Sequence, residues 1–213
     1  RNLPKLLLNP HPEWEVLTDA FRTLYTTIWH ASESRVLVDS SKVPAQLLLL
    51  RSIPELEVRV LHLVRDGRAV AHSWNKRQKL EPAVIGRVAY MPQHSLSRAM
   101  LTWIVENAFV LRLSRGLTST MIRYEDFTKH PKREMARALR ELHFKDVDLT
   151  FLNSPQISLR PTHSVGGNPI RFSDEKIGIV SHDHWQTQMS SSTKFLLGLL
   201  GMPMLLRFGY SLR

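Results

Sequence analysis

The spacing of apolar residues over the first fifty positions predicts a helix, a short strand and a second helix. Between Glu13 and Ser32 apolar side chains recur every three or four residues, which is typical of a helix with one apolar side. The run Val36-Leu37-Val38 is β-branched and flanked by charged residues and serine, so it predicts a strand. Pro44 suits the first turn of a helix that carries Leu47 to Leu50.

Strands and helices continue to alternate through the middle of the chain. Two further strands are predicted at residues 58–64 and 120–123, and helical spacing returns at residues 69–77, 95–113 and 131–142. Residues 150–174 are polar and have little period, so they predict a long functional loop. The apolar run 195–206 is shorter than the roughly 18–20 residues of a membrane helix and predicts a buried helix instead.

This order of elements predicts an α/β fold, in which a parallel sheet lies between helices as the middle of three layers. In sheets of this kind, ligands bind beyond the carboxyl ends of the strands. The segments after Val38, Val64 and Arg123 are therefore the places to look for a site.

Composition narrows the choice of partner. The chain has 213 residues, which fits a single domain over residues 1–213, a formal net charge of +10, and no cysteine. Disulfide scaffolds and cysteine-ligated metals are excluded, and the charge favours an anionic ligand. No signal-peptide pattern opens the sequence, so we predict a cytoplasmic protein with no membrane span. The basic residues are scattered and no zinc-finger or basic-aromatic motif is present, so no nucleic-acid partner is predicted.

The segment after the second predicted strand carries the clearest chemistry. Arg65 ends the strand, and Ser73 follows eight residues later, about two turns into the next helix. A guanidinium and a hydroxyl placed in this way can converge on one phosphate, although a surface arginine and an ordinary helix serine would have the same spacing. The full stretch His62-Leu63-Val64-Arg65-Asp66-Gly67-Arg68-Ala69-Val70-Ala71-His72-Ser73-Trp74 resembles the 3′-phosphate-binding segment of sulfotransferases that use 3′-phosphoadenosine 5′-phosphosulfate (PAPS). The family more often has proline where Gly67 stands.

Two later segments are similar to the same family. Arg123-Tyr124-Glu125-Asp126-Phe127 looks like its strand end, whose tyrosine lies against the adenine, so Tyr124 is the implied counterpart. Taken alone, this segment favours the other interpretation, in which Tyr124 belongs to the core and Glu125 and Asp126 suit a helix N-terminus. The loop Thr162-His163-Ser164-Val165-Gly166-Gly167-Asn168-Pro169-Ile170-Arg171-Phe172 resembles a nucleotide-covering loop. The resemblance implies that Gly167, Asn168 and Arg171 contact the cofactor; the other interpretation is a structural Gly-Asn-Pro turn.

The segment after Val38 is where this family often places its catalytic base. Here it reads Asp39-Ser40-Ser41-Lys42, and Lys42 stands where cytosolic members have a histidine. Lysine is cationic at neutral pH, so it would neutralise charge on the bridging oxygen rather than accept a proton. Asp39 would accept the proton of the acceptor, or would simply cap the helix that follows. The alternative bases are His11, His62 and His94.

The resemblance covers roughly residues 35–213 and implies a P-loop NTPase-like sulfotransferase fold. We expect a transfer of the sulfuryl group from PAPS to a hydroxyl or amine on a small-molecule or carbohydrate acceptor, with no metal. The family's strand and Gly/Ser/Thr-rich loop that hold the 5′-phosphosulfate have no counterpart in residues 1–34, so we expect an N-terminally truncated domain. The alternatives are a basic nucleic-acid- or nucleotide-binding module without catalysis, and a small-molecule kinase on a related fold.

Overall fold

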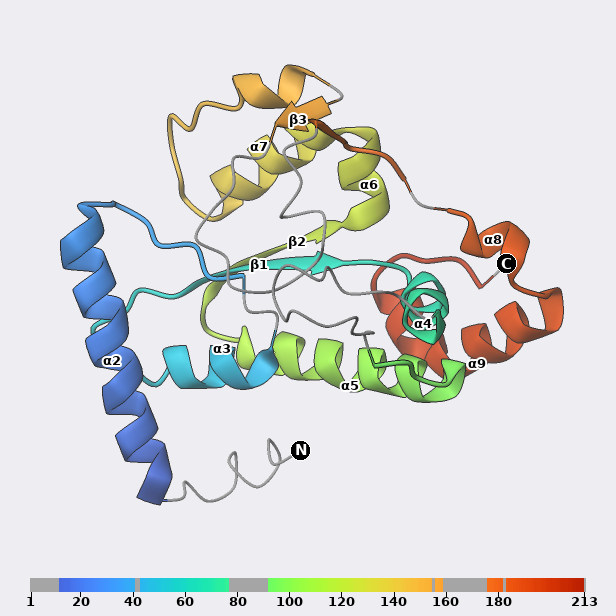
Figure 1. The fold of residues 1–213 in the computed structure, drawn as a ribbon, viewed down its shortest axis with the longest axis horizontal. Helices are drawn as coiled ribbons and strands as arrows, with labels where there is room; N and C mark the ends of the chain where they lie inside the picture. Colours follow the sequence, from blue (N-terminus) through green and yellow to red (C-terminus); the bar gives the residue numbers. More distant parts are fainter. Residues whose placement is uncertain are drawn as a thin grey trace, which may run out of the picture. The chain divides into compact units, whose positions relative to one another are not determined.

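The computed structural model describes residues 12–40, 43–76, 92–154, 156–158, 176–181 and 183–212. These residues form a mixed α/β structure in which helices predominate and the sheets are small (Figure 1). The chain divides into two compact units. One comprises Arg1–Val60 with Phe109–Thr118, and the other comprises Leu61–Ala108 with Ser119–Arg213. The strand ends at Val64 and Arg123 both belong to the second unit.

The first unit contains the two helices that the apolar spacing predicts, α2 (Pro12–Ser32) and α3 (Pro44–Leu50). Pro44 begins α3, where its missing N–H costs no hydrogen bond. Thr18 is buried in α2, whereas Leu24, Ile28 and Trp29 are about half exposed. The spacing therefore predicted the helix correctly, but not the burial of its apolar side.

The predicted strand at Val36–Val38 is wrong, because these residues belong to no helix or strand. Val38 is 89% exposed, and Val36 is exposed as well. A strand is stable only when a neighbouring strand satisfies its backbone groups and one of its faces is buried. A β-branched run of three residues supplies the propensity for a strand but neither of these tertiary requirements.

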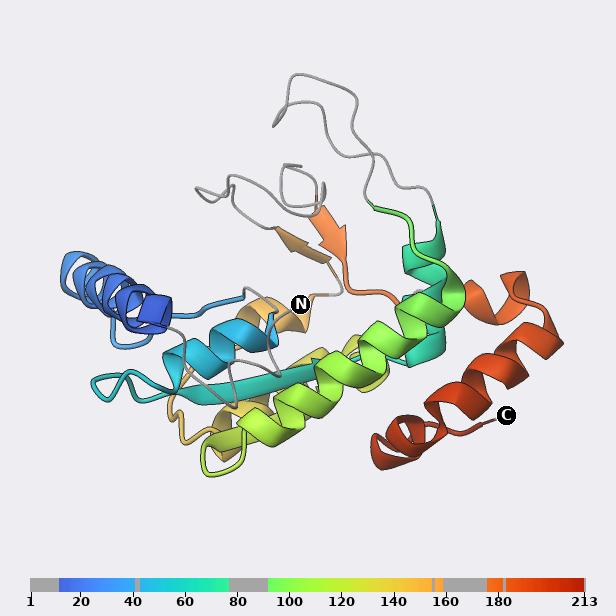
Figure 2. The ribbon, with the colours of Figure 1, turned by 90° about the horizontal axis from the view of Figure 1, so that it is seen from below.

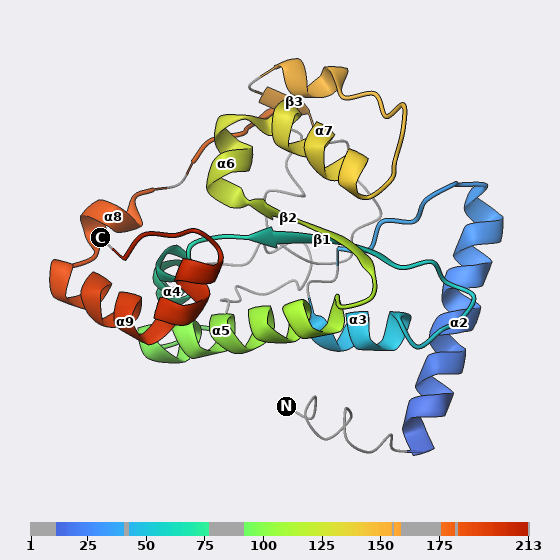
Figure 3. The same cartoon turned by 180° about the vertical axis from the view of Figure 1, so that it is seen from behind.

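A two-stranded parallel sheet consists of β1 (Arg59–Val64) and β2 (Thr118–Arg123), whose arrows point the same way in Figure 1, and most of its residues belong to the second unit. The crossover between them contains α4 (Gly67–Asn75) and α5 (Leu96–Leu113). Seen from behind in Figure 3, α4 begins just after β1, and α6 (Tyr124–Lys129) begins just after β2. Both strands thus end at the same edge of the sheet, as the parallel arrangement requires.

The remaining elements of the second unit follow α6. They are α7 (Pro131–Glu141), the 3₁₀ helix η2 (Thr150–Asn153), β3 (Gln156–Ser158), β4 (Lys176–Gly178), α8 (Trp185–Gln188) and α9 (Ser191–Arg207). β3 and β4 pair antiparallel with Ile157 opposite Ile177, and Figure 2 shows them side by side. The stretch predicted as a loop without regular structure therefore begins with a 3₁₀ helix and a short strand. Residues 159–175 lie outside the described residues.

The C-terminal helix α9 is buried along one side. Leu197, Gly201 and Leu205 face the interior, whereas Phe195 and Leu196 are 66% and 63% exposed. The predicted helix is confirmed, but its predicted burial holds for one face alone. Within the described ranges, no helix is both long enough and apolar enough to span a bilayer.

Gly67, the first residue of α4, lies against two core side chains. A Cβ atom at this position would lie 2.7 Å from Cε3 of Trp103 and 2.9 Å from Sδ of Met100. Trp103 is 4% exposed and Met100 is fully buried, so neither side chain can move into solvent. The close approach of α4 to α5 therefore requires glycine at this position.

We expect Gly67→Ala to lower the free energy of unfolding by about 1–3 kcal/mol, because the added methyl group overpacks the contact with Trp103. Gly198→Ala in α9 is the matched control, since the nearest atom to its Cβ would be the Leu212 carbonyl oxygen at 3.8 Å. That variant should gain about 0.5–1 kcal/mol from helix propensity. Urea denaturation of the three proteins measures both effects. Equal stability of Gly67→Ala and the parent would show that Trp103 shifts at no cost.

His62 of β1 makes the stability of the second unit depend on pH. Its Nε2 lies 2.8 Å from Oδ1 of Asn107, and its ring meets Phe208 edge to face. The Asn107 amide nitrogen donates to the Trp103 carbonyl, so its oxygen is the acceptor and Nε2 of His62 is the donor. Burial holds the pKa of His62 below its ordinary value, and the hydrogen bond to Asn107 opposes this effect only in part.

Because its folded pKa is lowered, His62 takes up a proton more readily in the unfolded chain. The stability it contributes should be constant above its ordinary pKa of about 6.5 and should fall as the pH drops below that value. We expect the His62→Gln variant to lose less stability than the parent between pH 7 and pH 5. Urea denaturation at a series of pH values measures the difference, and parallel curves for the two proteins would contradict it.

Candidate functional site

The carboxyl ends of β1 and β2 bring together two of the residues that the sequence singles out. Arg65 follows β1 directly and Tyr124 follows β2 directly. The guanidinium carbon of Arg65 lies 4.7 Å from the centroid of the Tyr124 ring, a cation–π contact. Any flat ligand that stacks on Tyr124 must therefore use the other face of the ring or displace the guanidinium.

The peptide group between Arg65 and Asp66 is held from two sides. The Arg65 carbonyl accepts a hydrogen bond of 3.1 Å from Nε1 of Trp103, on α5. The Asp66 N–H donates to Oε1 of Glu125, on α6, also at 3.1 Å. The other oxygen of that carboxylate accepts a 2.7 Å hydrogen bond from the Tyr210 hydroxyl. Burial, together with the Glu125 carboxylate, raises the pKa of Tyr210 well above its ordinary value, so this phenol stays a donor.

Asp66 and Arg68 form a buried ion pair in the turn that follows. One oxygen of Asp66 accepts the Arg68 backbone N–H and so caps α4, and the other lies 2.7 Å from Nη2 of Arg68. The two side chains are 7% and 5% exposed. Arg68 also donates to the Ser211 carbonyl and faces the Trp185 ring. Its charge and hydrogen bonds therefore serve the structure of the turn.

Ser73 lies on α4, two turns after Arg65, and is partly exposed. The residue before it, His72, has its pKa lowered first by burial and then by the positive charges of Lys76 and Arg65. Arg65 thus lies close enough to this turn of α4 to act on it electrostatically. Lys76 and Arg65 are the cations that act on His72, and the carboxylates of Asp66 and Glu125 lie at the same strand ends.

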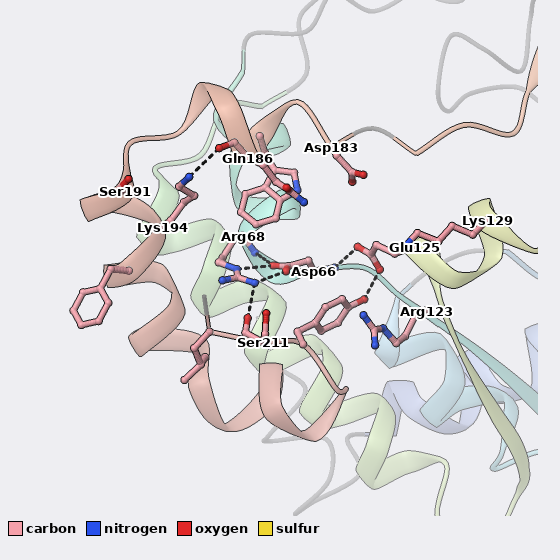
Figure 4. A pocket seen from close by; sticks show the side chains of 14 residues that line it. Asp66, Arg68, Arg123, Glu125, Lys129, Asp183, Gln186, Ser191, Lys194 and Ser211 are labelled. Atoms are coloured by element: carbon pink, nitrogen blue, oxygen red, sulfur yellow. Dashed lines mark hydrogen bonds and ion pairs between the residues drawn. The ribbon is translucent and has the colours of Figure 1, made fainter.

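A cavity of about 720 Å³ lies beside these strand ends in the second unit (Figure 4). Its lining residues come from the start of α4, from the end of β2 with α6, from α8 and the segment just before it, from α9, and from the C-terminal segment. They are Asp66, Arg68, Arg123, Glu125, Lys129, Asp183, Trp185, Gln186, Ser191, Lys194, Phe195, Tyr210, Ser211 and Leu212. Arg65, Ser73 and Tyr124 do not line it. No local sequence pattern predicts this cavity, because its wall is assembled from five separate segments.

Asp39 belongs to the first unit, where it accepts hydrogen bonds from the Tyr25 hydroxyl and from Nε2 of Gln46. Burial raises the pKa of Tyr25 to about 12, and the hydrogen bond to Asp39 adds to this effect. The N-cap of α3 is Val43, which makes no side-chain capping bond, so the alternative role of Asp39 as a helix cap is wrong. Asp39 instead contacts Gln46 in the first turn of α3.

Four predicted site residues lie outside the described residues, namely Lys42, Gly167, Asn168 and Arg171. Their predicted roles stay predictions. Among the residues that the structure does describe, no group of three or more His, Asp or Glu side chains is arranged to hold a metal ion.

Three residues at the strand ends carry contacts that the sequence did not predict. Glu125 lies in the first turn of α6, which confirms the predicted preference for a helix N-terminus, and its carboxylate also accepts a hydrogen bond from the Asp66 N–H. Trp103 and Tyr210 reach the same turn from elements far away in the chain. The sequence carries one indication of these contacts, which is that buried tryptophan and tyrosine usually find a hydrogen-bond partner.

No family model matches the chain, and a search of curated proteins finds no match either.

Proposed function

We propose that this chain binds the adenosine 3′-phosphate end of PAPS and that it belongs to a sulfotransferase. The observation that carries the proposal is the position of Arg65 and Tyr124, which come from two parallel strand ends and lie in contact. A cationic fork beside an aromatic ring is suited to a phosphate attached to a flat base. The resemblance of residues 62–74 to the 3′-phosphate-binding segment supports the same assignment.

The proposal gives each predicted cofactor-binding residue a role. Arg65 binds the 3′-phosphate through its guanidinium, and the Ser73 hydroxyl donates to the same group. Tyr124 provides the ring surface for adenine, on the face that Arg65 does not cover. Gly167, Asn168 and Arg171 complete the cover of the nucleotide by resemblance. The proposal also includes a fold, namely the three-layer fold of P-loop NTPase-like sulfotransferases. The small parallel sheet would be a part of its central layer.

The reaction is the transfer of a sulfuryl group to a hydroxyl or amine. The acceptor atom forms a bond to sulfur while the bond from sulfur to the 5′-phosphate oxygen breaks, and adenosine 3′,5′-bisphosphate leaves. By resemblance, Asp39 accepts the proton of the acceptor and Lys42 neutralises charge on the bridging oxygen. As in phosphoryl transfer, positioning and neutralisation of charge would supply most of the catalysis.

Isothermal titration calorimetry of the intact chain tests the proposal with three ligands. We expect adenosine 3′,5′-bisphosphate to bind at least about tenfold more tightly than adenosine 5′-monophosphate, because a charge-assisted hydrogen bond to the 3′-phosphate contributes about 1.5–3 kcal/mol. A DNA duplex should bind weakly and non-specifically. No binding of the bisphosphate at low salt would contradict the proposal. Binding of DNA with steep salt dependence in its place would favour the nucleic-acid-binding alternative.

A further inference from the structure

Glu125 is a carboxylate placed where a site for an anion would exclude one. Its neighbour in sequence, Tyr124, contacts the Arg65 guanidinium, and its own Oε1 accepts the N–H of Asp66, the residue after Arg65. A negative charge beside the predicted phosphate site repels a phosphate and so opposes its binding. Its presence therefore calls for a role other than direct contact with the ligand.

The hydrogen bonds indicate what that role is. The Arg65–Asp66 peptide has its carbonyl held by Trp103 and its N–H held by Glu125. Because both polar atoms of the peptide are bound, its plane cannot rotate without losing a hydrogen bond. Rotation of this plane changes the ψ angle of Arg65 and the φ angle of Asp66, so the two hydrogen bonds fix the backbone where β1 passes into the turn before α4 and thereby hold the Arg65 Cα at the strand end.

Tyr210 holds Glu125 in turn. Its hydroxyl donates to Oε2 of Glu125 at 2.7 Å and also lies 3.3 Å from the carbonyl of Val64, the last residue of β1. Tyr210 is 5% exposed, and its ring packs against the Arg123 guanidinium at 4.3 Å. The hydroxyl thus ties the C-terminal segment to the strand end and fixes the carboxylate that holds the Asp66 N–H. Figure 4 shows Glu125 at the wall of the cavity, close to both Asp66 and Arg123.

We propose that Glu125 and Tyr210 are positioning residues that hold the Arg65 strand end in the geometry that binds the 3′-phosphate. This inference rests on the function proposed above. Neither residue touches the nucleotide. Glu125 acts through the Asp66 N–H, and Tyr210 acts through Glu125. The charge of Glu125 costs some affinity, and the gain from a fixed strand end exceeds that cost because the backbone that carries Arg65 need not be ordered when the ligand binds.

The first measurement is amide hydrogen exchange at Asp66, followed by NMR on the intact chain without any ligand. In Glu125→Ala the Asp66 N–H loses its acceptor, so we expect its exchange to become at least about tenfold faster. Tyr210→Phe keeps the ring and its packing but loses the hydroxyl, and should give a smaller increase. We call the hydrogen bonds from Tyr210 to Glu125 and from the Asp66 N–H to Glu125 the clamp. Unchanged exchange at Asp66 in Glu125→Ala would overturn the proposed clamp, whatever the function of the protein.

The second measurement is the affinity for adenosine 3′,5′-bisphosphate. We expect Glu125→Ala to bind about tenfold more weakly and Tyr210→Phe about threefold more weakly, as the loss of ordinary hydrogen bonds would produce. Glu125→Gln retains an acceptor oxygen without the charge, so it should bind at least as tightly as the parent. A role through charge alone would instead make both Glu125→Ala and Glu125→Gln bind more tightly.

Glu141→Gln is the matched control. The Glu141 carboxylate also accepts a hydrogen bond from the Thr120 hydroxyl and forms an ion pair with Arg137. Glu141 is remote in sequence from Arg65 and Asp66. This variant should change neither the exchange at Asp66 nor the affinity. Failure of the parent to bind the bisphosphate overturns the proposed function and the role of the clamp in it. If the parent binds and Glu125→Ala binds equally well, the positioning role alone is overturned.

Discussion

The Arg65→Ala variant is expected to bind adenosine 3′,5′-bisphosphate at least about tenfold more weakly than the parent, and up to about a hundredfold. Arg65 is the charged group at the end of β1 and contacts the ring of Tyr124. A hydrogen bond from a guanidinium to a phosphate contributes about 1.5–3 kcal/mol, and each 1.4 kcal/mol is a tenfold change in affinity. Calorimetric titration of both proteins in the same low-salt buffer measures the ratio.

Two further variants separate the site from the general positive charge of the chain. Arg112→Ala removes an exposed arginine of α5 and should change the affinity by less than about twofold, since exposed charges are screened. Ser73→Ala removes one neutral hydroxyl and should cost about two- to tenfold. Equal weakening by Arg65→Ala and Arg112→Ala would mean that the nucleotide is attracted by overall charge and not by a built site.

The Arg68→Met variant is expected to lower the free energy of unfolding by about 3–5 kcal/mol. Both members of the Asp66–Arg68 pair are almost completely buried, so the variant leaves a carboxylate in the interior without its counter-charge. The lost hydrogen bond to the Ser211 carbonyl adds to the effect. Urea denaturation measures the change, and nucleotide affinity should be measured only on variants that remain folded.

The double variant Asp66→Asn with Arg68→Met tests the cause of that loss. It removes the uncompensated charge while the asparagine oxygen can still cap α4, so it should recover part of the lost stability. Arg22→Met is the surface control, because Arg22 is paired with Asp19 and Glu55 at exposed positions and should cost less than about 1 kcal/mol. A loss in Arg68→Met as small as in Arg22→Met would contradict the structural role of the buried pair.

Local patterns predicted most of the elements, because helix periodicity and helix starts depend on residues close together in the chain. α2, α3 and α7 begin near the expected residues, and β1 and β2 lie where the short apolar runs predict strands. The run Val36–Val38 has similar propensity and forms no strand. A strand needs a partner, and a single segment of sequence carries no information about its partner.

The candidate site shows the same division. The sequence by itself singled out Arg65, Ser73 and Tyr124 as candidates, through the rule that ligands bind at strand ends and through the resemblance of the segments that carry them. The roles of these residues stay predictions. The tertiary structure decided what holds them: the contact of Arg65 with Tyr124, the peptide held by Trp103 and Glu125, and the hydroxyl of Tyr210 beneath it. These hydrogen bonds join groups that lie far apart in the chain. Their partners are chosen by packing, which brings distant segments within about 3 Å of one another and which no local pattern encodes.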